Sequence, residues 1–280
     1  MVIITMKLNK IIITGTTGFI GSFLLKFFLE RNFFVVDIVR KKNKELLKLK
    51  KKYKKNYFTI KPNEIKKLKN KKFNFFIHTA TFYKSSYKKT EINELLESNI
   101  FFPINVLKQI YHKKLRLINF GSMMEYNKNF RDPKNAYAAS KVLFEEITKI
   151  FFFEKFYHIK IFETYDIRDI RPKILPTMLY SMKNNKQFKL NNKNLELNFI
   201  SRDNIASFLY RIITDNIASG TYVLKNRNNT NIHKLFLKLN SLKKNKIKIK
   251  FKKNIKKIKP KIKSINFNNK LFNIIKNEIR

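Results

Sequence analysis

The chain has 280 residues, 44% of them hydrophobic, which is enough for a substantial core in one large domain or in a domain with a smaller lobe. It contains no cysteine, so disulfides and thiolate metal sites are excluded, and a reducing compartment fits. The apolar stretch from Met1 to Gly15 is interrupted by Lys7, Asn9 and Lys10, and it matches neither a signal-peptide core nor a membrane span. We expect a cytoplasmic protein without a membrane partner.

The formal charge of +43 at pH 7 would suit a protein that binds nucleic acid. Lysine, however, is accompanied by many Asn, Ile, Phe and Tyr residues, all with A/T-rich codons, while Gly, Ala, Pro and Trp are scarce. The lysines are also spread along the whole chain. We therefore interpret the charge as a result of genomic base composition and expect no specific nucleic-acid partner.

The chain begins with the pattern of a buried strand, a helix and a second buried strand, over Ile11–Thr14, Ile20–Glu30 and Phe33–Val39. Such a βαβ unit builds a parallel sheet, so the fold class is α/β. Apolar patterning predicts two further strands and two further helices, at Phe73–His78, Leu115–Phe120, Glu91–Tyr111 and Ala138–Phe153.

The chain is less regular from Ile161 onward. The segment "KIKIKF", Lys246–Phe251, alternates with a period of two, as a half-exposed strand does. Lysine becomes denser over Leu242–Pro260, but apolar residues keep recurring there. We therefore do not expect a disordered tail.

The turn "TGTTGFIG" joins the first strand to the first helix. Gly15 permits the tight turn, Gly18 lets backbone approach a phosphate, and Gly21 lets the helix pack near the sheet with its N-terminus facing the anion. The triplet alone also occurs in ordinary strand-to-helix loops. Its βαβ context predicts a dinucleotide site, to which we assign three further residues of the turn, Thr17, Phe19 and Ile20.

A second signal is "YAASK", in which Tyr137 and Lys141 lie four residues apart on one face of a helix. An ammonium group near a phenol lowers the phenol's pKa and makes it a usable proton donor and acceptor. Ser122, at the end of a predicted strand, would share a substrate oxygen with the tyrosine. Taken alone, the pair also fits an ordinary amphipathic helix with a surface lysine.

Four segments, "TGTTGFIG", "FIHTAT", "NFGSMMEY" and "NAYAASKVLFEE", in this order resemble the extended short-chain dehydrogenase/reductase family, also called the NAD-dependent epimerase/dehydratase family. The resemblance continues through "IFETYDIRDIRPKILPTML", "NFISRDNIA" and "SGTYVLKNRNNTNIHKLF". It implies a Rossmann-type doubly wound parallel sheet for NAD(P) over residues 1–165. It also implies a smaller C-terminal α/β lobe for a nucleotide sugar over residues 166–280, partly intermixed with the first domain.

The same resemblance implies a catalytic set of Ser122, Tyr137 and Lys141, with Asn99 supporting a proton relay. His78 and Ala80 are assigned to the cofactor site, although His78 fits a structural residue at a strand end better than a ligand. Arg171 or Lys173 would bind the phosphates of the substrate. An arginine that many relatives carry is Leu197 here. With four scattered histidines and no carboxylates paired at ligand spacing, we expect no metal.

The choice between NAD and NADP depends on which residues at the end of the second predicted strand contact the ribose. The general spacing rule favours Asp37 as a ligand of a ribose hydroxyl, and therefore NAD. An ungapped count along the family pattern instead places Val39 at the acidic position, followed by Arg40, whose positive charge suits the 2′-phosphate of NADP. We prefer NADP, with NAD as the alternative.

Met123 and Met124 follow Ser122 at the positions where family dehydratases carry an acid and a base. Neither methionine can transfer a proton, so dehydration of the sugar is disfavoured and hydride transfer remains. The segments most resemble nucleotide-sugar 4-ketoreductases of the CDP-abequose and CDP-paratose synthase type, which implies reduction of a nucleotide-linked 4-keto-6-deoxy sugar in carbohydrate biosynthesis. The alternatives are a nucleotide-sugar 4-epimerase with tightly bound NAD, and a noncatalytic family member that binds nucleic acid or protein through its basic surface. We also expect a homodimer.

Overall fold

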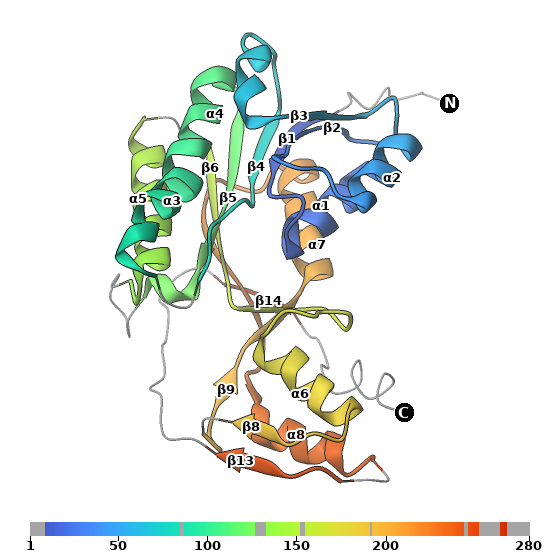
Figure 1. Cartoon of the computed structure of the whole chain (residues 1–280). Helices are drawn as coiled ribbons and strands as arrows, with labels where there is room; N and C mark the ends of the chain where they lie inside the picture. The colour runs from blue at the N-terminus through green and yellow to red at the C-terminus, as the bar shows by residue number, and fades with distance from the viewer. Residues whose placement is uncertain are drawn as a thin grey trace.

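The computed structural model describes residues 9–84, 87–126, 133–151, 155–190, 192–243, 246–251 and 264–267, the last of these as backbone. Figure 1 shows a large sheet with helices on both sides and a smaller lobe beneath it. The stretch Met1–Leu8, the end of the expected helix at 152–153 and most of the lysine-dense segment, at 244–245 and 252–260, lie outside the described residues.

The main sheet has eight strands, all parallel, in the order β14-β11-β6-β5-β4-β1-β2-β3. In chain order these are β1 Lys10–Thr14, β2 Phe34–Ile38, β3 Tyr57–Ile60, β4 Phe75–His78, β5 Arg116–Ser122, β6 Phe156–Ile161, β11 Gly220–Asn226 and β14 Ser264–Phe267. From β1 the chain winds first toward β3 and then, from β4, in the opposite direction, so the strand order reverses between β1 and β4. This is a Rossmann-type doubly wound sheet, and the predicted fold class is confirmed.

Helices cover both faces of this sheet because its strands are apolar on both faces. Ile11 and Ile13 of β1 pack with α1 and α7, whereas Ile12 packs with α4 and α5. Figure 1 shows the same two layers, with α1, α2 and α7 on one side and α3, α4 and α5 on the other. The helices of the two layers are α1 Phe19–Leu29, α2 Lys44–Lys52, α7 Arg202–Thr214, α3 Ile92–Leu96, α4 Phe102–Ile110 and α5 Ala136–Phe151.

The single helix expected over Glu91–Tyr111 is instead three consecutive segments. A π-helical turn, η3 Glu97–Phe101, separates α3 from α4, and Pro103 lies in the first turn of α4. π-turns inside helices occur often at functional sites. Here the turn carries Asn99, whose side chain is buried.

The smaller lobe has a core of its own, built around Met178, Phe188 and Phe236. Its elements are β7 Glu163–Tyr165, α6 Ile174–Lys183, β8 Phe188–Leu190, β9 Glu196–Leu197, β10 Phe199–Ser201, β12 Thr230–Asn231, α8 Ile232–Asn240 and β13 Ile249–Phe251. The chain leaves the main sheet after β6, returns for α7 and β11, and leaves it again. The two parts are therefore interleaved in sequence.

The strand predicted at Lys246–Phe251 forms over its second half only, as β13, which pairs in parallel with β8. The remaining short 3₁₀ segments are η1 Pro62–Leu68, η2 Lys89–Glu91 and η4 Met123–Glu125. Within the residues that the structure describes, no helix is long and apolar enough to cross a bilayer.

Candidate active site

The glycine-rich turn lies where the strand order reverses, next to the carboxyl end of β4. Gly15 has a φ of +79°, and a Cβ added there would lie 2.4 Å from the backbone nitrogen of Ala80. A Cβ on Gly21 would lie 2.2 Å from the carbonyl oxygen of Gly15. Both positions therefore require glycine, one for conformation and close approach and the other for close approach alone.

Helix α1 begins immediately after Gly18, which caps it without a side chain. The first turn of α1 contains no acidic residue. The positive end of the helix dipole is thus available to an anion, and the cradle between β1 and β4 leaves room for backbone only. The residues of this turn fit a dinucleotide diphosphate, as the sequence predicts.

Asp37, the alternative ribose ligand, is fully buried beneath this turn. Its Oδ2 accepts hydrogen bonds from Thr16 Oγ1 at 2.8 Å and from the Tyr57 hydroxyl at 2.9 Å. Burial raises the pKa of Asp37 to about 6, and the bonds from Thr16 and Tyr57 oppose that rise. Asp37, in β2, therefore links the turn, through Thr16, to β3, through Tyr57. Arg40, just beyond the end of β2, is exposed.

His78 is also fully buried, between the rings of Phe76 and Phe144. Its Nδ1 lies 2.9 Å from Thr14 Oγ1, and burial, followed by the nearby Lys141 charge, lowers its pKa. These contacts fit the structural role that the sequence suggested for His78 at the end of β4. Its assignment to the cofactor site stays a prediction.

Helix α5 carries Tyr137 and Lys141 on one face. The Lys141 ammonium lies 5.8 Å from the centroid of the Tyr137 ring. Between them, Ser140 accepts a hydrogen bond at 2.9 Å from Asn99 Nδ2. Asn99 Oδ1 in turn accepts from the backbone nitrogen of Phe82 at 2.7 Å, so the predicted asparagine joins α5 to the loop after β4.

The protonation of this pair differs from the expectation. Burial raises the pKa of Tyr137, and the Glu125 carboxylate and the Tyr83 and Tyr87 phenols add to the rise. Burial also lowers the pKa of Lys141 to about 8, with Glu125 opposing. The expected lowering of the Tyr137 pKa by Lys141 is not found, and desolvation of the phenol is the largest cause of the rise. Tyr137 is therefore a protonated phenol at neutral pH.

Ser122 ends β5 and caps the 3₁₀ turn η4, its hydroxyl accepting from the backbone nitrogen of Met124 at 3.2 Å. Met123 is buried and Met124 is half-buried. Glu125 is the first acidic residue after Ser122, and it is turned inward and buried. The positions beside Ser122 thus carry thioethers and no exposed carboxylate.

Two basic residues of the smaller lobe face this region. Arg171 is bound by Asp169 and lies 3.4 Å from the centroid of the Phe19 ring, next to the glycine-rich turn. Lys173 pairs with Glu163 at 3.3 Å and lies 5.2 Å from the centroid of the Tyr83 ring. Both predicted phosphate ligands are therefore partly engaged by acidic neighbours.

Sequence reasoning missed two residues of this region. Tyr83 packs edge-on against Tyr137, with ring centroids 4.9 Å apart. Arg202 lies 4.5 Å from the Phe19 ring centroid and donates to the Phe19 carbonyl oxygen. In the sequence, Arg202 lies in the segment "NFISRDNIA", directly after Ser201, the N-cap of α7.

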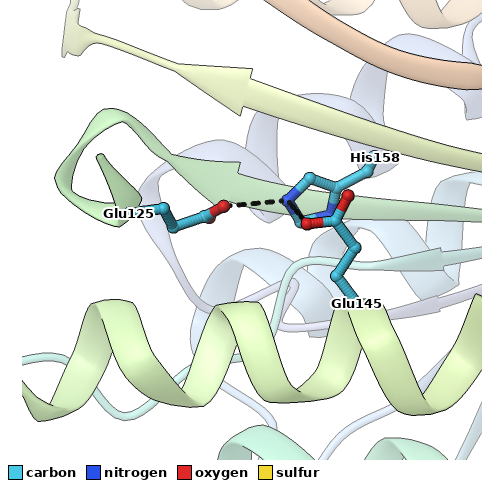
Figure 2. Close-up of side chains that lie close together, drawn as sticks. All are labelled: Glu125, Glu145 and His158. Carbon is cyan, nitrogen blue, oxygen red and sulfur yellow. Dashed lines mark hydrogen bonds and ion pairs between the residues drawn. The ribbon is translucent and has the colours of Figure 1, made fainter. Parts of the chain in front are cut away.

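A buried cluster of Glu125, Glu145 and His158 lies beside Ser122, with ligand atoms within 4.8 Å of one another (Figure 2). These are metal-ligating residue types. However, the buried Lys160 ammonium lies 3.0 Å from Glu125 Oε2 and 3.8 Å from Glu145 Oε2. Because an ammonium group already neutralises these carboxylates, we interpret the cluster as an ion-pair network.

Residues 11–224 match the sequence profile described as the NAD dependent epimerase/dehydratase family. The chain belongs to this family. It is therefore an enzyme of an NAD-dependent family, and the resemblance inferred from its motifs is confirmed.

Among characterised proteins, CDP-abequose synthase of Salmonella muenchen is 25% identical over 222 residues, covering 76% of this chain and 73% of that protein. Two solved structures have TM-scores of 0.73 at 18% identity: UDP-glucuronic acid 4-epimerase from Bacillus cereus, covering 93% of this chain and 90% of the other, and UDP-N-acetylglucosamine 4-epimerase from Methanobrevibacter ruminantium, covering 97% and 92%. At this identity the structures support the fold alone.

Proposed function

We propose that the enzyme reduces a nucleotide-linked 4-keto-6-deoxy sugar with NADPH. The observation that carries this proposal is the Tyr137–Lys141 pair on α5, together with the two methionines that follow Ser122. A thioether neither gives nor takes a proton at neutral pH, so elimination of water lacks its acid and base. The sequence likeness to CDP-abequose synthase supports the same reaction class.

The bound dinucleotide would supply the hydride. Tyr137 would then give its proton to the oxygen of the former ketone, and Ser122 would hydrogen-bond the same oxygen. A phenol whose pKa is raised by burial is fully protonated at neutral pH and suits this donor role. Lys141, with a pKa of about 8, would hold the nicotinamide ribose and remain mostly protonated at pH 7.

The preference for NADPH rests on the end of β2. Asp37 is buried, and its carboxylate accepts hydrogen bonds from Thr16 and Tyr57. Val39 is also buried, whereas Arg40 is exposed. A guanidinium group suits a phosphate as a charge-assisted ligand. The nucleotide-sugar substrate, with its diphosphate near Arg171 or Lys173, the homodimer and the cytoplasmic location belong to the same proposal.

The proposal is tested by following NADPH oxidation with 4-keto-6-deoxy sugars linked to CDP, dTDP and UDP. In Tyr137→Phe, kcat should fall by about two orders of magnitude or more, because the general acid is lost, whereas NADPH binding measured by calorimetry should be retained. Tyr180→Phe, which alters an exposed tyrosine of the smaller lobe, is the matched control. Near-normal turnover by Tyr137→Phe would refute the assigned role.

A 4-epimerase with tightly bound NAD is the second candidate, favoured by the match to the NAD dependent epimerase/dehydratase family. An epimerase returns the hydride to the same sugar and needs no added cofactor. Release of one equivalent of NAD on denaturing the purified protein, together with interconversion of UDP-sugars without added cofactor, would favour it. Exchange of NADPH into cofactor-free protein would favour the reductase.

A further inference from the structure

The buried cluster beside Ser122 draws its members from three elements (Figure 2). Glu125 ends the turn η4, three residues after Ser122. Glu145 lies on α5, four residues after Lys141 and eight after Tyr137, so all three share one helix face. His158 and Lys160 are alternate residues of β6, opposite Asn119 and Gly121 of β5. The cluster therefore lies between the serine turn and the tyrosine helix.

Glu125 connects the two sides of the cluster. Its Oε1 accepts a hydrogen bond from the backbone nitrogen of Ser122 at 2.6 Å. Its Oε2 lies 3.0 Å from Lys160 Nζ and 3.3 Å from His158 Nε2. The same imidazole nitrogen is 3.4 Å from Glu145 Oε2, so β6 bridges a carboxylate of the serine turn to one of α5.

Gly121, the residue before Ser122, has no room for a side chain because the cluster lies against it. A Cβ on Gly121 would lie 2.2 Å from His158 Nε2 and 2.6 Å from Glu125 Oε1. On the other edge of the ring, Asn119 Nδ2 donates to His158 Nδ1 at 3.0 Å, which leaves the Nε2–H facing the two carboxylates. The His158 imidazole and the Glu125 carboxylate therefore occupy the space that a side chain at position 121 would need.

The rest of the cluster is also paired. Glu145 Oε1 accepts from Lys149 at 2.7 Å and from Thr221 at 3.1 Å, and Lys160 donates to the Tyr126 hydroxyl at 2.7 Å. Two carboxylates and two ammonium groups thus surround the imidazole of His158. Buried hydrogen bonds and ion pairs of this kind restrict the movement of Glu125, Glu145 and Lys160.

We propose that Glu125 is a positioning residue, which ties Ser122 to helix α5 and keeps a buried negative charge beside the Tyr137–Lys141 pair. The catalytic part of this inference rests on the proposed function. Glu125 acts through Ser122 and through its charge, without touching the substrate.

The charges around the pair support this role. Tyr137 faces Glu125 from η4 and Tyr83 and Tyr87 from the loop after β4. Lys141 faces Glu125 and, from β4, His78. Glu125 raises the pKa of both members of the pair, so the loss of its charge should lower both values.

The experiment compares Glu125→Gln with Glu64→Gln in the full chain. Glutamine keeps the size of the side chain and removes its charge. Glu64 is a matched control because it also accepts from the backbone nitrogen at the start of a 3₁₀ turn, that of Lys61, and pairs with a lysine, Lys67, but on the surface.

The first readout does not require turnover. NMR of protein labelled at lysine Cε should show one lysine that titrates near pH 8, assigned to Lys141 by its loss in Lys141→Met. In Glu125→Gln this pKa should fall by several tenths of a unit to about one unit, and the Ser122 amide proton should move upfield as its bond to a carboxylate is replaced. In Glu64→Gln both signals should stay in place. Unchanged signals in Glu125→Gln would overturn the inference.

Turnover is the second readout. With the keto-sugar nucleotide, Glu125→Gln should lower kcat about tenfold to a hundredfold, as expected for a slightly misplaced serine, and shift the alkaline limb of the pH profile to lower pH with KM little changed. If the wild type reduces no keto sugar but the NMR signals still shift, the proposed function fails and the positioning inference stands. If the wild type is active and Glu125→Gln changes neither the NMR signals nor the pH profile, the positioning inference fails.

A second variant keeps the test decisive if Glu125→Gln does not fold. Glu125→Asp keeps the charge but shortens the reach toward Ser122 by one methylene. The Ser122 amide should then shift and kcat should fall, while the Lys141 titration stays near its wild-type value. A wild-type Ser122 signal and wild-type kcat in Glu125→Asp would overturn the positioning role.

Discussion

The buried Glu125 carboxylate makes a quantitative prediction about acid stability. Burial by itself would raise its pKa, but the hydrogen bond and charge of His158, the charge of Lys160 and the Ser122 backbone bond together lower it from 4.5 to about 2. A folded-state pKa below the unfolded value means that ionised Glu125 stabilises the fold. That stabilisation is fully present above pH 4.5 and is lost as the pH falls toward 2. The shift corresponds to about 3 kcal/mol at neutral pH.

The assay is urea unfolding of the wild type and Glu125→Gln at pH 7 and at pH 3, followed by circular dichroism. Urea is uncharged and, unlike guanidinium chloride, does not screen ion pairs. The wild type should be more stable than Glu125→Gln by about 3 kcal/mol at pH 7 and by less than half of that at pH 3, where the unfolded wild type binds a proton that the folded protein does not.

The control is again Glu64→Gln, whose partly exposed carboxylate should give a small difference that changes little with pH. A stability difference between the wild type and Glu125→Gln that is equal at pH 7 and pH 3 would refute the reasoning. It would mean that the substitution disturbs packing only, and that the charge of Glu125 contributes nothing to stability.

Gly121→Ala should destabilise the protein by about 1–3 kcal/mol or more in urea, because the new methyl group meets the buried His158 ring and the Glu125 carboxylate, and unchanged stability would contradict that packing. Arg40→Ala should lower the preference for NADP over NAD about tenfold to a hundredfold in calorimetric titrations, since a hydrogen bond to a charged group is worth about 1.5–3 kcal/mol. Asp37→Asn should leave that preference unchanged; a strong loss of NAD binding in Asp37→Asn, with no effect of Arg40→Ala, would instead favour the NAD-dependent epimerase.

The first βαβ unit was predictable because its signals are local. The apolar run of β1, the glycines at intervals of three and the helical spacing of α1 lie within a short stretch of chain, and the structure has β1 and α1 within one residue of the predicted bounds. The required glycines of the turn follow from the same stretch. Ala80, which approaches Gly15, lies in the loop after β4, far along the chain, and only the resemblance indicated it.

The break in the helix expected over Glu91–Tyr111 was not visible from its apolar pattern. A π-turn adds a residue to one turn without changing which residues are apolar, so periodicity alone predicts one continuous helix. The break is tied to Asn99, whose amide is held by Phe82 and Ser140, contacts that exist only in the folded chain. The edge strand β3 and helix α2 were not predicted from the sequence. The segments around them are rich in lysine, which obscures their apolar pattern.

The site was predictable only in its motif residues. Ser122, Tyr137 and Lys141 follow from short patterns, but the groups that shift the pKa values of Tyr137 and Lys141 lie on other elements of the fold. Glu125 becomes important only because β6 pairs with β5 in a register that brings Lys160 opposite Gly121. No local pattern in the sequence specifies that pairing.

The excess of lysine makes the acidic residues the more informative class in this chain. The sequence has 62 Lys and Arg residues against 19 Asp and Glu residues, so almost any surface position tolerates a lysine. Burying a charged group is costly unless it is paired, and this applies to lysine whatever the base composition of the genome. Lys141 and Lys160 are among the largest fully buried side chains, and the charge of Glu125 favours the protonated form of Lys141 and pairs directly with Lys160. A scarce carboxylate that pairs with Lys160 and favours protonated Lys141 is therefore a better guide to this candidate site than the net charge.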